Sequence, residues 1–401
     1  MVDTKLSERA LLFLLASVQF THIMDFMVMM PLGPQLMRLF EMRPDQFSML
    51  VAVYTFSAAI AGLGGAFFLD RHDRKHSLLF CYAGFLLGTV GCALSPDYQT
   101  LLIARIVSGA FGGVSGAIVL TIVGDVIPPQ RRAAGFGIVM ASFAVASVVG
   151  VPVSLWLAAR WSWHIPFMMV AGIGSFIWLT IRFRFPNLRE HLTSGGSKSR
   201  QAFDGLKEIL TDKNTLTALS FMALMVFGHF IIIPFLSPSM VANAGMQENE
   251  LSYIYLAGGI GSMFTVPLIG KLADRHGRLK IYGILILGTT IPVYLITHQE
   301  PAHLSSILLG TAAFFIFAGG RFAPGQAIVT SSVPARLRGS FMSLNSSGRD
   351  FASGAASLLG GHIIVKDMAT GRLLHYPTLG WIAIAVSLLS ILVASRVKAV
   401  A

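Results

Sequence analysis

Charged residues are scarce in this chain. Only 12% of its 401 residues are Asp, Glu, Lys or Arg, and 54% are hydrophobic, whereas soluble domains carry about 25% charged residues. The remaining charges are clustered, and the apolar runs between them are long enough to cross roughly 30 Å of hydrocarbon as helices. This shortage of charge argues against an ordinary soluble domain and predicts an all-α membrane protein.

Cysteine is nearly absent as well. Cys81 and Cys92 fall on one predicted helix, too far apart for a disulfide. His72 and His76 lie in a basic loop without an acid suited to a metal site, and no phosphate-binding loop for an ATP-driven pump is present. We therefore expect no bound metal, no cofactor and no enzymatic activity.

Acidic residues are fewer than basic ones, 19 against 30, which gives a formal net charge of +11. Such an excess can indicate nucleic-acid binding. However, roughly 22 of the 30 basic residues fall on the side of the membrane on which the N-terminus is predicted to lie. This positive-inside asymmetry predicts that both termini are cytoplasmic. The expected partners of the basic loops are membrane lipids, not nucleic acid.

Twelve hydrophobic spans are predicted. They cover residues 10–40, 44–69, 76–95, 98–127, 133–159, 161–183, 214–242, 249–273, 280–298, 303–331, 338–364 and 375–396. A turn-rich segment followed by an amphipathic stretch, residues 184–213, interrupts the pattern and indicates a linker on the cytoplasmic face. The chain therefore divides into an N-terminal half (1–183), a linker (184–213) and a C-terminal half (214–401).

The two halves look like a repeat. The sequence Asp-Arg-His-Asp-Arg begins at Asp70 after the second span, and Asp-Arg-His-Gly-Arg begins at Asp274 after the eighth, an offset of 204 residues (274 minus 70). The same offset relates Asp25 to His229. Parallel repeats of six spans place a substrate site between the halves, near the membrane midplane. Coincidence among short basic loops is the alternative, but order, spacing and topology agree.

Several motifs resemble those of one transporter family. The run from Gly270 to Arg278, Gly-Lys-Leu-Ala-Asp-Arg-His-Gly-Arg, resembles the loop signature of the major facilitator superfamily. Arg105-x-x-Ser-Gly looks like its fourth-span R-x-x-Q-G element. Gly150-Val-Pro152 is similar to the glycine–proline motif of antiporters, and the following Trp-His-x-x-Phe looks like a motif of the twelve-helix drug:proton antiporter branch, which also holds sugar exporters. The resemblance implies a secondary transporter with two six-helix halves.

The resemblance also implies a cytoplasmic gate. In the family, the loop aspartate caps a helix of the opposite half, and the loop arginine pairs with an acid at the inner end of the fourth span. In this chain those positions carry Asp70, Arg71, Arg74 and Asp125, with Asp274, Arg275 and Arg278 as the second-half counterpart. Simple anchoring of the loops by basic residues is the alternative. The first-half loop departs from the signature, with Ala66 and Asp73 replacing its two glycines.

Asp25 is the first candidate for chemistry inside the membrane. It lies near mid-depth of the first span, with His22 and Thr21 on the same helix face. A charge at a helix centre costs about 2.5–3.5 kcal/mol on insertion scales. Because protonation removes this cost, Asp25 can couple proton occupancy to conformation. The alternative is a permanently hydrogen-bonded acid that fixes helix packing.

The eleventh span carries the second candidate. A polar stripe at helical spacing contains Ser343, Ser346, Ser347, Asp350, Ser353, Gly354 and Ser357, with Arg349 adjacent. Because such a stripe cannot face lipid, it is expected to face the other half or a water-filled cavity. Asp350 either pairs with Arg105 or Arg321 across this cavity or carries a proton. We expect Asp350 and Asp25 to face the cavity from opposite halves.

The other membrane-embedded candidates are less sharply defined. By resemblance, Arg105 serves either proton coupling or packing, and Arg321 is likewise open between pairing and packing. His229 occupies the repeat position of Asp25, but a single histidine in a membrane helix more often packs than binds.

The leading functional hypothesis is proton-coupled efflux of small organic, amphipathic molecules by alternating access of the two halves. Export or facilitated passage of sugars or other metabolites is one alternative, and a membrane receptor or scaffold that transports nothing is another. The expected partners are a small-molecule substrate, protons and lipids. The expected unit is a monomer in a bacterial inner membrane.

Overall fold

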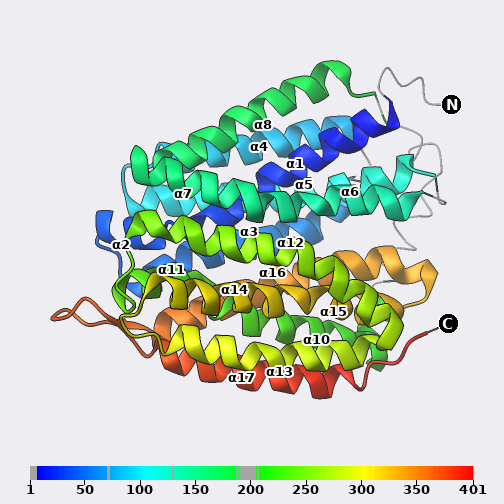
Figure 1. The fold of residues 1–401 in the computed structure, drawn as a ribbon. Helices are drawn as coiled ribbons and strands as arrows, with labels where there is room; N and C mark the ends of the chain where they lie inside the picture. Colours follow the sequence, from blue (N-terminus) through cyan, green and yellow to red (C-terminus); the bar gives the residue numbers. More distant parts are fainter. Residues whose placement is uncertain are drawn as a thin grey trace.

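The computed structural model describes residues 7–69, 73–128, 131–186, 188, 205 and 207–400. Within these residues, eleven helical segments are long and apolar enough to cross a membrane. A further long helix, α16 (Arg338–Ile363), completes the predicted set of twelve. Its serines and its Arg349–Asp350 pair make it the most polar of the spans, which explains why hydropathy alone does not select it. The all-α fold of twelve spans in two six-helix halves is confirmed (Figure 1).

The spans follow the predicted order, and four of them are interrupted. The N-terminal half comprises α1 (Glu8–Met29) with α2 (Gly33–Leu39), α3 (Pro44–Leu69), α4 (Arg74–Ala93), α5 (Tyr98–Val126), then α6 (Arg132–Val145), the π-helical turn η1 (Ala146–Gly150) and α7 (Val151–Arg160), and α8 (His164–Arg184). The C-terminal half comprises α10 (Lys213–Phe230) with α11 (Ile233–Ala242), η3 (Glu248–Glu250), α12 (Leu251–His276), α13 (Arg278–Thr297), α14 (Leu304–Gly320) with α15 (Phe322–Ser331), η4 (Ala335–Leu337), α16 and α17 (Tyr376–Ala394).

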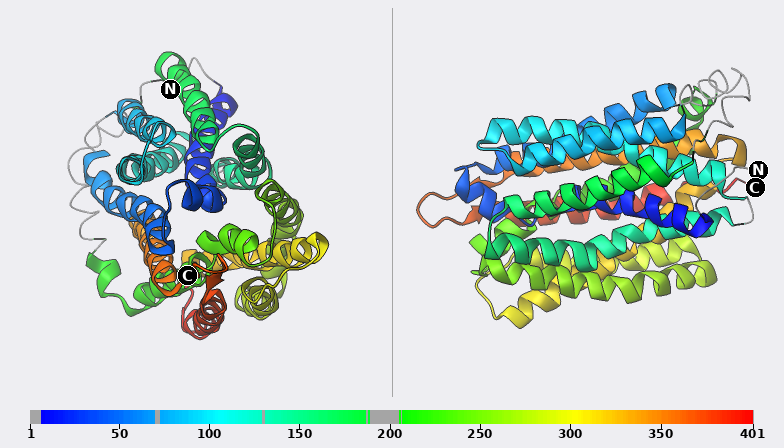
Figure 2. Two further views of the ribbon diagram at one scale, coloured as in Figure 1. Left: turned by 90° about the vertical axis from the view of Figure 1, so that its left-hand side faces the viewer. Right: turned by 90° about the horizontal axis from the view of Figure 1, so that it is seen from above.

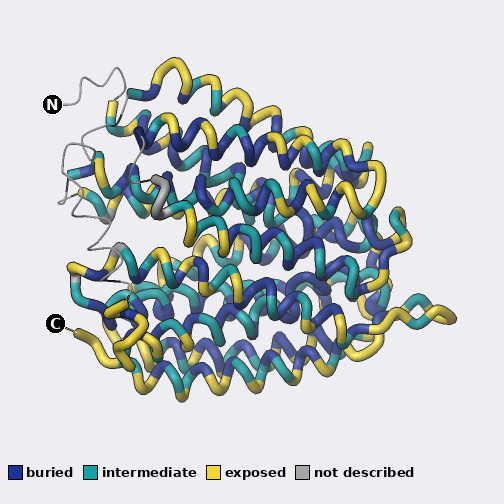
Figure 3. The backbone as a smooth tube through the Cα atoms, turned by 180° about the vertical axis from the view of Figure 1, so that it is seen from behind, coloured by how far each residue is buried: buried dark blue, intermediate teal, exposed yellow. Residues whose placement is uncertain are grey.

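Both chain ends lie at one end of the bundle, which we call the terminal side (Figures 1 and 2). The opposite end, the far side, carries a small antiparallel hairpin of β1 (Val365–Lys366) and β2 (Leu373–Leu374) between α16 and α17. Exposed residues follow the outer helices (Figure 3). Large apolar residues are among them, and Phe176, Phe183 and Leu309 are each more than 70% exposed. In water these faces would be unstable, so they are the surfaces that contact lipid.

Local signals fix several helix ends. The Asp97 side chain accepts a hydrogen bond from the backbone N–H of Thr100, and the Thr100 hydroxyl lies within reach of the Asp97 backbone N–H, a capping box that starts α5. This backbone hydrogen bond lowers the pKa of Asp97. The Asp212 side chain caps α10 through the backbone N–H of Thr215.

The two repeated loops turn differently. Gly277, between α12 and α13, has φ +97°, a region that favours glycine. The equivalent residue of the first half is Asp73, whose backbone is not left-handed and whose side chain instead accepts a hydrogen bond from the Lys75 backbone N–H to start α4. The altered glycine of the first-half signature thus changes how the next helix begins.

The first and seventh spans are interrupted at matching places. Pro31 and Pro34 lie at the break between α1 and α2, and Pro234 and Pro238 lie beyond the break between α10 and α11. Proline lacks the N–H that a continuous helix requires. Because the two breaks are related by the repeat, α2 and α11 form equivalent short helices at the far side.

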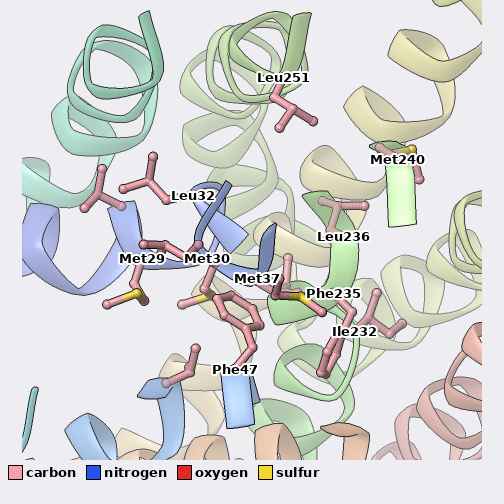
Figure 4. Packing of buried hydrophobic residues seen from close by; sticks show 14 of the residues in the cluster. Met29, Met30, Leu32, Met37, Phe47, Ile232, Phe235, Leu236, Met240 and Leu251 are labelled. Atoms are coloured by element: carbon pink, nitrogen blue, oxygen red, sulfur yellow. The ribbon is translucent and has the colours of Figure 1, made fainter. Parts of the chain in front are cut away.

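The hydrophobic core shows which ends of the halves are joined. At the far side, one buried cluster contains residues of both halves (Figure 4), among them Met29, Met37, Phe47, Phe235 and Met240. Towards the terminal side, the N-terminal and C-terminal halves have separate clusters. The halves therefore share one buried core at the far side, and towards the terminal side each half has a core of its own.

One pair of helices keeps the halves in contact over much of its length. α3 and α16 run antiparallel with small residues facing each other: Ser48 opposite Gly361, Thr55 opposite Gly354, and Gly62 opposite Ser347. These residues recur at a spacing of seven on each helix, the repeat of a close, coiled-coil-like seam. We call these six residues the small-residue seam.

The end of the predicted linker, residues 207–213, lies against the C-terminal half, whereas Phe185 and Leu188 at its start are buried in the N-terminal half. Ile209 is fully buried in the C-terminal core cluster, and Glu208 forms a bidentate ion pair with Arg336 of η4, with N–O distances of 2.5 and 2.7 Å. The amphipathic end of the linker is therefore packed on protein and is not simply lying on lipid. Most of the linker lies outside the described residues.

Candidate functional site

Asp25 lies at the centre of a buried ion pair. Its Oδ2 is 2.8 Å from Arg105 Nη1 of α5, which also donates to the Asp25 backbone carbonyl at 3.1 Å. The Thr89 hydroxyl of α4 donates to Asp25 Oδ1 at 3.0 Å. Both charged side chains are 0% exposed. Three helices thus hold one carboxylate inside the membrane-spanning part of the N-terminal half.

The Arg105 guanidinium also stacks on an aromatic ring. Its Cζ lies 4.1 Å from the ring centroid of Tyr54 on α3, a cation–π geometry that is strengthened by desolvation. The rings of His22 and Phe26, both on α1, stack against the Tyr54 ring, with centroids 6.1 and 5.4 Å from its centroid. Tyr54 therefore joins α1, α3 and α5 around the ion pair.

The neighbours expected for Asp25 from helix spacing are only partly present. The Thr21 hydroxyl forms a hydrogen bond of 2.8 Å with the Tyr82 hydroxyl and none with Asp25. His22 is half-buried, and neither ring nitrogen has a hydrogen-bond partner within the described residues. The polar contact comes instead from Thr89, a residue of an apolar helix with no distinguishing signal in the sequence.

His229 occupies an aromatic environment in the C-terminal half. Its ring stacks on Phe314 at 5.7 Å and meets Phe230 and Phe322 edge-on. Phe230 in turn contacts Phe26 of the other half at 5.9 Å. Phe26 and Phe230 differ by the repeat offset of 204, so two repeat-related rings meet next to Asp25 and His229.

Arg321 lies at the junction of α14 and α15 and is directed into the C-terminal half. It donates to Ser387 Oγ of α17 at 3.1 Å and to the Met225 carbonyl of α10 at 3.4 Å. These contacts match the packing alternative. The pairing of Asp350 with Arg105 or Arg321 is not seen in this conformation, because Arg105 binds Asp25 and Arg321 binds neutral groups.

Asp350 and Arg349 are half-buried neighbours on α16, and neither forms an ion pair within 4.0 Å with another described residue. Tyr54 contacts Arg105, the partner of Asp25, and it directly precedes Thr55 of the seam that joins α3 to α16.

Part of the predicted gate is brought together. Arg74 Nε lies 3.3 Å from Asp125 Oδ2 at the terminal end of the N-terminal half. In the second half, Asp274 and Arg278 are 3.9 Å apart on consecutive helices, and Arg278 also donates to the Ala327 carbonyl. Asp70 and Arg71 lie outside the described residues, and Arg275 is exposed.

The predicted glycine–proline motif coincides with the π-helical turn of the fifth span. A side chain at Gly150 would collide with the thioether of Met24, one residue before Asp25. Pro152 follows at the start of α7. Gly150 thus permits the fifth span to approach the first at the level of the ion pair.

The far side carries an ion pair that the sequence did not indicate. Arg38 of α2 forms a bidentate contact with Glu248 of η3, with Nη2 3.1 Å from Oε2. Because α2 and η3 belong to opposite halves, this contact links the halves at the far side. Both groups are partly exposed, so the contribution of the pair to stability is small.

Comparison with known proteins decides the family. The profile of the Major Facilitator Superfamily matches residues 15–230 and 218–399. The chain belongs to the Major Facilitator Superfamily. The inner membrane transport protein YdhP of Escherichia coli is 24% identical over 355 residues, 87% of this chain and 86% of that protein. A chloramphenicol efflux pump of Mycobacterium tuberculosis is 21% identical over 334 residues, 80% of this chain and 77% of that protein.

The fold of this superfamily member is also that of solved transporters. The D-xylose–proton symporter aligns with a TM-score of 0.77 at 16% identity, covering 97% of this chain and 99% of that one. Integral membrane location and a transporter fold follow from these findings together with the exposed apolar helix faces.

Proposed function

We propose that this superfamily member is a proton-coupled exporter of small organic compounds, and that Asp25 is its proton carrier. The observation that supports the proposal is the fully buried Asp25–Arg105 ion pair, 2.8 Å long, inside the N-terminal half and one residue from Phe26, which contacts the other half. A carboxylate held this way is stable when ionised only as long as its arginine stays in place.

The chemistry follows from this dependence. Protonation of Asp25 removes its negative charge, which weakens its hold on Arg105 and leaves the guanidinium with the Tyr54 ring as its main contact. Loss of the proton restores the pair and draws α1 and α5 together. Helix α1 contacts Gly150 of the fifth span through Met24, and it contacts Phe230 of the other half through Phe26. Proton occupancy can therefore bias how the halves pack.

Export as the direction is supported by three observations. The glycine–proline motif, similar to that of antiporters, lies against Met24 beside the ion pair. One relative is named a chloramphenicol efflux pump. The shared core closes the halves together at the far side, and the distribution of basic residues assigns the opposite, terminal side to the cytoplasm, the side from which an exporter loads its substrate.

Proton flux in proteoliposomes tests the proposal. Purified protein is reconstituted with a preset pH gradient, and chloramphenicol and other small organic compounds are added one at a time. We expect at least one compound to accelerate decay of the gradient, and Asp25→Asn to abolish this effect while remaining folded and inserted. Asn has nearly the shape of the protonated acid but cannot cycle a proton.

A matched control is Asp97→Asn, which alters a helix cap on the far side without touching the ion pair. It should retain compound-driven flux. Full coupled transport by Asp25→Asn would show that another group carries the proton, and Asp350 would be the next candidate.

A further inference from the structure

Three side chains of the N-terminal half bring unsatisfied polar atoms to one patch. Within the described residues, Gln19 Oε1, both ring nitrogens of His22 and the Tyr54 hydroxyl are buried and lack hydrogen-bond partners. Tyr54 is only 2% exposed. Leaving a buried polar group unpaired costs about 1–3 kcal/mol, so several such atoms together point to a ligand that pairs with them.

Glycines of α5 form the floor of this patch. The position that a Cβ would take at Gly112 is 3.0 Å from His22 Nε2 and 3.1 Å from the Tyr54 hydroxyl. The same position at Gly116 is 3.5 Å from Gln19 Oε1 and 3.9 Å from His22 Nδ1. The polar atoms therefore converge on two residues without side chains, which let His22 and Tyr54 approach the backbone of α5 closely. We call Gln19, His22 and Tyr54, with this floor, the polar niche.

The niche adjoins the small-residue seam, through which α3 packs on α16. The small-residue seam sets Thr55 against Gly354 and Gly62 against Ser347, so Asp350 and Ser353 lie at the level of α3 just beyond Tyr54. Ser353 Oγ is also buried without a partner among the described residues. The niche thus has a polar counterpart on the other half.

The formal charges around the niche cancel. Asp25 is paired with Arg105, Asp350 is adjacent to Arg349 on α16, and Arg321 is directed away to Ser387 and the Met225 carbonyl. A cationic or anionic ligand would leave one charge uncompensated inside the membrane, which is costly. Neutral donors and acceptors are what the niche offers, next to the rings of Phe26 and Tyr54.

We propose that the polar niche binds the hydroxyl or amide groups of a neutral substrate whose flat apolar part contacts Phe26 and Tyr54. This assignment rests on the proposed transport function and names its substrate class. It favours uncharged, hydroxyl-rich or amide-bearing molecules over lipophilic cations and organic anions.

A charge series on one scaffold tests the assignment. The probes are phenyl glucoside, which is neutral, phenyl glucuronide, which is anionic, and phenyl 6-amino-6-deoxyglucoside, which is cationic. Binding to the purified full-length protein is measured by thermal stabilisation and by isothermal titration. We expect the neutral probe to bind at least tenfold more tightly than either charged probe. Tighter binding of a charged probe, or no binding of the neutral one, would overturn the proposal.

Two tyrosine variants test the residues. Tyr54→Phe removes the unpartnered hydroxyl and should weaken the neutral probe roughly three- to tenfold, the worth of one hydrogen bond. Tyr82→Phe is the matched control, because the Tyr82 hydroxyl is already hydrogen-bonded to Thr21. The affinity of this variant for the neutral probe should equal that of the wild type. Equal affinity in both variants would exclude the niche.

Failure of this assignment can be told apart from failure of proton coupling. Asp25→Asn should still bind the neutral probe, because the niche remains. If the neutral probe binds but never moves protons, the proposed coupling is wrong and the niche stands. If protons move only with a charged probe, coupling stands and the niche assignment is wrong.

Discussion

At the scale of single residues, the energetics of the ion pair decide what its mutation does. Asp25 and Arg105 are both fully buried, and Thr89 is the one further side chain that binds the carboxylate among the described residues. Removing one partner of a buried pair strands the other charge, whereas removing both together is often nearly neutral. The pair can therefore be essential for transport while contributing little net stability.

We predict that Arg105→Met lowers the stability of the protein by about 3–5 kcal/mol at neutral pH, less if Asp25 becomes protonated, and that the double variant Asp25→Asn/Arg105→Met recovers most of the loss. The physical reason is that the double variant strands no charge. A double-mutant cycle of thermal unfolding in detergent measures this. Additive effects of the two single variants would mean that the two side chains do not interact.

At the scale of helices, the small-residue seam sets how closely α3 and α16 approach. A methyl group at Gly361 would collide with the Ser48 hydroxyl and lie 3.0 Å from the Pro44 carbonyl oxygen. Gly348, on the same helix, has nothing within 4 Å of its Cβ position. The same substitution therefore has opposite consequences at two sites of one helix.

Gly361→Ala should destabilise the protein by about 1–3 kcal/mol through overpacking and slow transport. Gly348→Ala should be neutral or stabilising by up to about 1 kcal/mol, because alanine favours helix. Unfolding temperatures and transport rates of the two variants provide the comparison. Similar behaviour of both would show that the seam is not tightly packed.

Residues 207–211 at the end of the linker are helical, and this linker helix is held by a contact that depends on pH. Hydrogen bonding from Arg336 lowers the pKa of Glu208 below its ordinary value of 4.5. The pKa of Glu208 is lower when the helix is docked than when it is undocked. The contribution of the Glu208–Arg336 pair to docking is therefore complete above pH 4.5 and is lost as the pH falls through the lowered pKa.

We predict that acidification below this range exposes the linker helix, and that Glu208→Gln does so at neutral pH. A cysteine at Ile209, which is buried, reports exposure through its labelling rate, and one at Leu210, which is 49% exposed, is the control. The native cysteines are both buried, so they contribute little background labelling. Unchanged labelling of the Ile209 cysteine in Glu208→Gln would mean that hydrophobic packing alone holds the helix.

For the whole molecule, the sequence predicts the architecture well because hydrophobic length and basic loops are strong, additive signals. The number of spans, their order and the two halves follow from them. The breaks in the first, seventh and tenth spans do not, since proline and glycine are common in membrane helices. The far-side contact of Arg38 with Glu248 joins residues 210 positions apart, which no local pattern reveals.

The candidate site is predicted only in part, for the same physical reason. Asp25 and Arg105 stand out in the sequence as site candidates because they are ionisable residues inside predicted membrane spans. Their pairing cannot be predicted in this way, because it depends on how α1 packs on α5. Tyr54 and Thr89 are ordinary residues of apolar helices and carry no signal of their own. Their roles emerge only when the cation–π contact and the hydrogen bond to Asp25 are seen.

Proton release on ligand binding tests the central claim most directly. Purified protein in weakly buffered detergent solution is mixed with a compound that it transports, and the pH change is followed by a soluble indicator. If Asp25 couples substrate to proton, the wild type releases protons on binding, and Asp25→Asn binds the compound but releases none. Equal proton release by the two proteins would contradict the account.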